Sequence, residues 1–202
     1  LKKHGLRPVA MNLAVGHLHA RGDAEANRRR LREVEGACRL MERLGMAVAS
    51  FYPGYRAEGR PWDHVLADEV ATIREMLAVA AQSRVTLAVE LHAMTPFETV
   101  EQGTALLAAL PELRVAYDPS HYAMQEIPLT RTEAFLDRTV HVHVRDAAAG
   151  KMQVPLGEGT VDMGWLADAL HRRGYDGCWS VEYLPGLEGA DVSVTFDAPL
   201  AG

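Results

Sequence analysis

The chain has 202 residues, of which 48% are hydrophobic and 24% are charged. This length supports one sizeable core, so we expect a single domain over residues 1–186, followed by a loosely ordered tail over 187–202. The net charge of -6 provides no basic surface for nucleic acid, and no apolar run reaches the roughly 18 residues of a membrane helix. Two cysteines are too few for a disulfide framework, so we expect a cytoplasmic protein.

Short runs rich in valine and alanine alternate with segments of helical period along the chain. The first helical segment has Gly45 as its expected stop, and Thr95-Pro96-Phe97-Glu98 has the pattern of a capping box that would begin the third helix. The expected strands cover 8–15, 46–52, 85–91, 113–117, 140–144 and 178–183. The expected helices cover 24–44, 66–80, 95–110, a short stretch from 130, and 162–173.

This alternation predicts an α/β fold with a parallel sheet. In the strands over 85–90, 139–143 and 178–183, one face is bulky and apolar, and the other is small or polar. A doubly wound sheet should be apolar on both faces, so we expect a TIM (β/α)8-type barrel instead. A full barrel takes roughly 250 residues, and with six strands this chain is expected to lack about two βα units.

Four side chains that bind metals well stand near the carboxyl ends of four strands: Glu90, Asp118, His143 and Glu182. In a barrel they would converge at the mouth, where barrel enzymes keep their active sites. Three carboxylates cannot gather in a low-dielectric pocket without a compensating cation. We therefore predict that these four residues, the ligand cluster, hold one divalent metal ion. Such a donor set suits Mn²⁺ first, then Mg²⁺ or Co²⁺, with Zn²⁺ still possible.

Several motifs resemble one known family. They are AVELH over 88–92, AYDPSH over 116–121, HVHVRD over 141–146, GEGTVD over 157–162, and GYDG over 174–177 followed by VEY over 181–183. Together they resemble the xylose isomerase-like TIM barrels, a group of sugar-phosphate isomerases and epimerases that also contains the AP endonuclease family 2 enzymes. The resemblance runs from about Gly5 to Pro185.

The resemblance implies roles for individual positions. The ligand cluster matches the family's metal ligands, and Glu90 and Glu182 also match its acid/base pair. His121 and Arg145 match substrate-contacting positions. The family also places the strand over 8–15 third in the barrel, so the first two βα units would be absent from this chain.

Weaker candidates for substrate binding surround the cluster. His92 is expected to face away from Glu90, either as a donor behind the metal ligands or as a surface residue. Glu158 lies between two glycines in a loop on the site side, and Trp62 would either floor a sugar pocket or simply pack. His141 has the phase of His143 but lies deeper, which favours a core histidine.

The cluster and the resemblance together favour a metal-dependent isomerase or epimerase of a keto-sugar, polyol or sugar phosphate. Glu90 or Glu182 would remove a proton next to a metal-bound carbonyl, giving an enediolate that is then reprotonated. The same site would also serve a dehydratase of an inosose- or dehydroshikimate-type keto-polyol. A third interpretation is a non-catalytic sugar-binding remnant, which has no reason to keep Glu182 as a second carboxylate.

DNA repair is a further alternative within the superfamily. Those enzymes carry a zinc-binding His-Pro-Gly turn, which is Tyr52-Pro53-Gly54 here, and the acidic net charge does not favour binding along phosphates. We therefore expect a small sugar or polyol as the partner, with no nucleic acid and no membrane. An open sheet edge would invite pairing with another chain, so we also expect a homodimer or a poorly stable chain.

Overall fold

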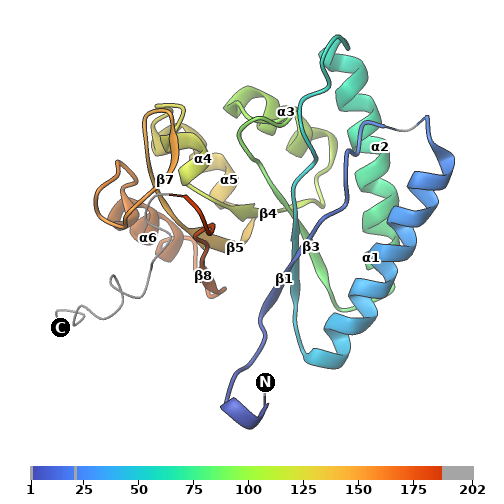
Figure 1. Ribbon diagram of the computed structural model, residues 1–202, viewed down its shortest axis with the longest axis horizontal. Helices are drawn as coiled ribbons and strands as arrows, with labels where there is room; N and C mark the ends of the chain where they lie inside the picture. Colours follow the sequence, from blue (N-terminus) through green and yellow to red (C-terminus); the bar gives the residue numbers. More distant parts are fainter. Residues whose placement is uncertain (1, 21, 188–202) are drawn as a thin grey trace.

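The computed structural model describes residues 2–20 and 22–187 (Figure 1). Apart from residue 187, the tail expected over 187–202 lies outside the described residues. Among the helices that are described, none combines the length and the apolar character needed to cross a membrane.

Six parallel strands form one sheet in the order β1-β2-β3-β4-β5-β8. The sheet curls into a half-barrel, which confirms the expectation of an incomplete TIM barrel (Figure 1). Each strand lies inside its expected range, except that β5 begins one residue earlier than expected. The strands are β1 (Ala10–Leu13), β2 (Val48–Phe51), β3 (Thr86–Glu90), β4 (Arg114–Tyr117), β5 (Thr139–Val144) and β8 (Trp179–Val181).

The helices pack on the outer face of the sheet, as the apolar phase of the strands predicted (Figure 1). Leu87 and Val89 of β3 join the buried cluster that also contains Ile73, Met76 and Leu106 from the helices. The helices are α1 (Ala24–Leu44), α2 (Trp62–Ala80), α3 (Val100–Ala109), α4 (Ser120–Ala123), α5 (Glu133–Leu136) and α6 (Met163–His171), with the 3-10 turns η1 (Lys2–His4) and η2 (Leu129–Thr132).

The ends of α1 show why this helix matches its expected range. The Asp23 side chain accepts hydrogen bonds from the N–H groups of Glu25 and Ala26, which would otherwise lack partners in the first turn. Gly45 follows the last turn with a φ of +75°, a conformation that glycine adopts without strain. Gly45 is the stop that the sequence analysis expected, and Asp23 is a further local signal that it did not use.

The third helix starts later than the capping-box pattern predicted. It begins at Val100, and Thr99 rather than Thr95 is its N-cap. The Thr95 hydroxyl instead donates to His92 O at 2.6 Å and accepts from Phe97 N–H at 3.2 Å. The pattern therefore stabilises a turn after β3 that buries Phe97, and it does not start a helix.

Two elements near the site were not predicted. The short helix α4 follows β4, and an antiparallel hairpin of β6 (Asp146–Ala148) and β7 (Lys151–Val154) follows β5. The hairpin turns at Gly150, whose φ is +70°. Both elements lie at the carboxyl-terminal mouth of the half-barrel and help to build the site described below.

Candidate active site and metal centre

The ligand cluster assembles at the mouth of the half-barrel. Glu90 ends β3, Asp118 follows β4, His143 lies in β5, and Glu182 follows β8. One ligand atom from each residue lies within 4.8 Å of the other three. The four residues come together because the carboxyl ends of neighbouring parallel strands meet at one edge of the sheet.

His143 is the centre of the cluster's hydrogen bonding. Its Nδ1 lies 3.2 Å from Glu90 Oε1 and 3.0 Å from Glu182 Oε2. Burial lowers the pKa of His143, but the hydrogen bonds to Glu182 and Glu90 outweigh burial and raise it to about 10. Burial raises the pKa of Glu90, yet hydrogen bonds from His121 and His143 hold it well below its ordinary value. Without a metal, a proton on His143 offsets part of the cluster's negative charge.

Arg145 is a buried cation that balances Asp118. Its guanidinium pairs with Asp118 Oδ2, and its Nε donates to the Ser120 hydroxyl at 2.9 Å. The Ser120 N–H also donates to Asp118 Oδ1 at 2.8 Å. These bonds orient the Asp118 carboxylate within the cluster.

His121 is fully buried beside Glu90. Its Nε2 lies 3.3 Å from Glu90 Oε1 and 3.2 Å from Arg145 Nη2. Depending on the tautomer, Nε2 either donates to Glu90 or accepts from Arg145, which can only donate. Nδ1 is buried and has no hydrogen-bond partner among the described residues. The site therefore holds a polar atom whose hydrogen bonding is unmet.

His92 faces the same side as Glu90, not the opposite side as expected. His92 and Glu90 both line the cavity described in the next paragraph. The centroid of the His92 ring lies 3.7 Å from that of the His121 ring. β3 ends at Glu90, and a chain that continues extended for two residues brings position 92 back to the face of position 90. Burial and the neighbouring His121 lower the pKa of His92, so the ring is neutral near pH 7.

The cluster opens into a cavity of about 240 Å³. Glu90, Arg145 and Glu182 line it together with residues of β1, β2 and the segments that follow those strands. The lining residues are Asn12, Leu13, Ala14, Ser50, Phe51, Tyr52, Glu90, His92, Arg145, Glu182 and Leu184.

Asn12 and Ser50 are site residues that the sequence analysis missed. Asn12 Nδ2 donates to Glu182 Oε1 at 3.0 Å, and the Ser50 hydroxyl donates to Asn12 Oδ1. The two residues are register partners on β1 and β2. The rule that assigned small or polar residues to the inner face of the later strands would have found both.

Two other candidates lie outside this cavity. Trp62 begins α2, and its Nε1 donates to Pro96 O at 3.0 Å. Glu158 is exposed in the loop after β7. Neither residue is among the described residues that line the cavity. His141 lies in another cavity beside His143, and burial lowers its pKa to about 4, so it is a neutral inner histidine.

The β6–β7 hairpin holds the segment that carries Glu182, which lies beyond the end of β8. Leu184 N–H donates to Gln153 Oε1 at 2.7 Å, and Gln153 Nε2 donates to Leu184 O at 3.2 Å. On the preceding side, Glu182 N–H donates to Val144 O at 3.1 Å. The buried Gln153 side chain thus bonds to the backbone of Leu184 as a neighbouring strand would. This holds the segment that carries Glu182.

Asp146 ties the hairpin to the loop that follows it. Its carboxylate accepts the N–H groups of Ala147, Gly157, Gly159 and Val161 at 2.9 to 3.2 Å. A Cβ added to Gly159 would overlap this carboxylate, so only glycine fits there. Four backbone donors compensate the buried charge and fix the loop over the hairpin.

The donor set fits a hard or borderline divalent cation. Three carboxylates face one guanidinium and, in the metal-free protein, one protonated imidazole. The remaining excess of negative charge is what a divalent cation would neutralise on displacing the proton from His143. The close approach of three carboxylates is otherwise costly in a buried pocket.

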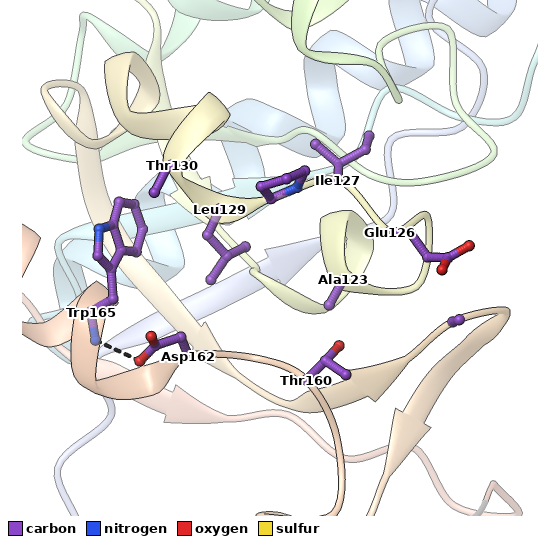
Figure 2. Close-up of a pocket in the computed structure, with 10 residues that line it drawn as sticks. Ala123, Glu126, Ile127, Leu129, Thr130, Thr160, Asp162 and Trp165 are labelled. Atoms are coloured by element: carbon purple, nitrogen blue, oxygen red, sulfur yellow. Dashed lines mark hydrogen bonds between the residues drawn. The ribbon is translucent and has the colours of Figure 1, made fainter.

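A separate groove of about 430 Å³ lies between the α4–η2 segment and α6 (Figure 2). Its apolar walls come from Ile127, Leu129 and Trp165. The Asp162 carboxylate accepts a hydrogen bond from the backbone N–H of Trp165 at 2.8 Å. No member of the ligand cluster lines this groove. We therefore do not assign it to the site.

The fold and site define an incomplete TIM barrel with a candidate metal centre at its mouth. Residues 1–196 match the family model of the xylose isomerase-like TIM barrels, and the chain belongs to this family. This confirms the resemblance found in the motifs. A comparison with curated proteins finds no match.

Solved structures share the fold at low sequence identity. The 3-keto-D-glucoside 4-epimerase from E. coli is 17% identical, with a TM-score of 0.75 over 90% of this chain and 73% of that chain. The IolI protein with a bound zinc atom is 18% identical, with a TM-score of 0.76 over 95% and 74%. D-allulose 3-epimerase from Methylomonas sp., in complex with D-allulose, is 20% identical, with a TM-score of 0.75 over 98% and 71%.

Proposed function

We propose that this chain is a divalent-metal-dependent isomerase or epimerase that acts on a keto-sugar or polyol. The observation that carries the proposal is the placement of Glu90 and Glu182. The two carboxylates come from different strands, both reach His143 Nδ1, and both line one cavity. Proton transfer next to a carbonyl needs one base to take the proton and one acid to return it.

The remaining site residues would bind and orient the substrate. His121 is fully buried and does not itself line the cavity, so it would act by orienting Glu90 and His92, which do line it. Arg145 lines the cavity while it pairs with Asp118, so it would position substrate oxygens near that carboxylate. His92 packs against His121 and would keep its ring in place.

The ligand cluster would hold the metal ion through Glu90, Asp118, His143 and Glu182. When bound, the ion would supply polarisation of the substrate carbonyl and stabilisation of the negative charge that develops on its oxygen. Mn²⁺ is our first expectation from the donor set, and Zn²⁺ is kept as an alternative because the IolI structure contains zinc.

The named relatives support this class of reaction. Two of the three structures above are described as sugar epimerases, and one was solved with a ketose. Because their identity to this chain is low, they support the reaction class and leave the substrate to experiment.

Solvent deuterium exchange is the direct test. Metal-stripped protein would be reloaded with Mn²⁺ and incubated in D₂O with a panel of ketoses and inososes, and proton NMR would follow each sugar. We expect deuterium to enter at the carbon next to the carbonyl of at least one sugar, together with an epimer or aldose. Glu182→Gln is the comparison variant and should strongly slow the appearance of both signals.

The same spectra separate the alternatives. Loss of water from an inosose or another keto-polyol would assign a dehydratase instead. Binding without exchange, seen as line broadening of a sugar that stays undeuterated, would assign a sugar-binding remnant. Either result would contradict the proposed reaction.

A further inference from the structure

A row of aromatic and imidazole rings follows the mouth of the half-barrel from β4 towards β1. It starts at the site and leads away from the metal ligands. Successive ring centroids lie 3.7, 5.8, 6.1 and 5.9 Å apart. The rings belong, in this order, to His121, His92, Tyr52, Tyr55 and His17.

The outer end of this row is exposed although it is held in place. Tyr55 is 54% exposed, and Met94, on the neighbouring loop after β3, is 42% exposed. Tyr52, which separates Tyr55 from His92, lines the cavity. Tyr55 and Met94 do not line the cavity themselves, and Tyr55 is joined to it through the ring contact with Tyr52.

Backbone contacts between three loops fix Tyr55. Its N–H donates to His17 Nδ1 at 3.3 Å, and Leu18 N–H donates to Pro53 O at 3.2 Å. Gly54 adopts a φ of +93° and comes so close to His17 that an added Cβ would lie 2.8 Å from the His17 Cα. The backbone that carries Tyr55 is therefore already ordered before a ligand binds.

The loop after β3 is tied to the same surface. Arg56 N–H donates to Met94 O at 3.0 Å, and the Arg56 guanidinium pairs with Glu98. Met94 itself has a φ of +67°, which is unusual for a residue with a side chain. These contacts hold Met94 next to the loop that carries Tyr55.

The charges around this surface argue against an anionic ligand group. Arg56 is engaged with Glu98, and Arg60 pairs with Asp68 and donates to His19 O. Arg145, inside the cavity, pairs with Asp118. These three arginines are thus each partly neutralised by a carboxylate, whereas aromatic faces suit the C–H face of an uncharged ring.

We propose that Tyr52, Tyr55 and Met94 form a second subsite, which binds an uncharged ring linked to the reacting keto-sugar. The substrate is then a keto-glycoside or disaccharide rather than a free or phosphorylated ketose. This inference rests on the proposed function, because it places the reacting carbonyl at the ligand cluster. The attached ring would stack on Tyr55 and cover Met94.

Calorimetry with paired ligands tests the subsite. The probes are D-fructose, fructose 6-phosphate, and the disaccharides that carry glucose on O3, O4 or O6 of fructose, each titrated into Mn²⁺-loaded protein. We expect at least one disaccharide to bind about fivefold or more tightly than D-fructose, and the phosphate ester to bind less tightly. In Tyr55→Ala that gain should disappear while D-fructose binding is unchanged.

Leu40→Ala is the matched control, because Leu40 is 45% exposed on α1, away from this surface. It should keep the gain. The subsite is overturned if no disaccharide binds more tightly than D-fructose, if the gain survives in Tyr55→Ala, or if the phosphate ester is preferred. If Mn²⁺ binds but no sugar does, the proposed function fails, and the subsite fails with it.

Discussion

Glu90 and Glu182 have the same chemical group in different surroundings. The Glu90 side chain is 10% exposed and bonds to two imidazoles, whereas the Glu182 side chain is 22% exposed and bonds to one imidazole and to Asn12. Glu182 is therefore the more accessible of the two carboxylates. In the proposed reaction, this difference would distinguish the two carboxylates as proton-transfer groups.

We expect Glu90→Gln and Glu182→Gln each to slow deuterium exchange by roughly 10²- to 10⁴-fold at saturating Mn²⁺, because each change removes one proton-transfer group. Exchange rates by NMR check this, and thermal melting shows whether the variants remain folded. Full exchange in either variant would remove that residue from the acid/base pair.

Glu69 is a buried carboxyl outside the site, on α2. Its Oε1 lies 3.2 Å from His19 Nδ1, and its Oε2 has no partner among the described residues. Arg30 is also buried, where its guanidinium donates to Val15 O and His17 O. Burial raises the pKa of Glu69 from about 4.5 to about 7, although the hydrogen bond with His19 opposes the rise.

This pKa gives a pH dependence of stability with a definite sign. Between about pH 4.5 and 7 the unfolded chain loses the Glu69 proton while the folded chain keeps it, so this group lowers stability as pH rises. Glu69→Gln should remove the effect. We expect the free energy of unfolding of the variant, relative to the parent, to rise by about 2 kcal/mol between about pH 5 and 8. Urea titrations check this, and an unchanged difference would contradict it.

At the scale of elements, the β6–β7 hairpin positions Glu182 through Gln153. We expect Gln153→Ala to weaken Mn²⁺ binding about tenfold, because positioning partners of a metal site typically contribute this much. In the Glu182→Gln background the same change should have little further effect. A double-mutant cycle by calorimetry measures this coupling. Additive losses would show that Gln153 only stabilises the hairpin.

The same element shows the limit of prediction from sequence. The helix Ala24–Leu44 was predicted to its ends, because its helical period and the stop at Gly45 are local signals. The hairpin has only three and four paired residues, and it is stabilised by contacts to Leu184 and to the loop at Gly159. Such contacts join residues far apart in the chain, and no local sequence pattern predicts them.

The site, too, has parts that the sequence could predict and parts that it could not. The ligand cluster was predictable, because strand ends in a parallel barrel share one mouth and its residues differ chemically from their apolar neighbours. The bonds of Arg145 to Asp118 and of Asn12 to Glu182 were not, because they depend on side-chain directions across several strands. The start of the third helix was predicted too early for a different reason. The local pattern at Thr95 is real, but it stabilises a turn instead of a helix.

At the scale of the molecule, the half-barrel has two strand edges, β1 and β8. A side-chain hydrogen bond between Asn12 and Glu182 crosses between them, and Trp179 and Val181 of β8 are exposed. Unpaired edges with apolar side chains favour association, so we expect concentration-dependent self-association in sedimentation experiments. A monomer that melts cooperatively at all concentrations would contradict this expectation.

The measurement that bears most directly on the whole account is a Mn²⁺ titration by calorimetry of the metal-stripped chain, with Glu182→Gln run in parallel. We expect one site in the parent, a strong loss of affinity in the variant, and release of a proton from His143 near pH 7, detectable as a dependence of the heat on the buffer. Absence of binding to the parent, or equal binding to both proteins, would contradict a metal centre formed by Glu90, Asp118, His143 and Glu182.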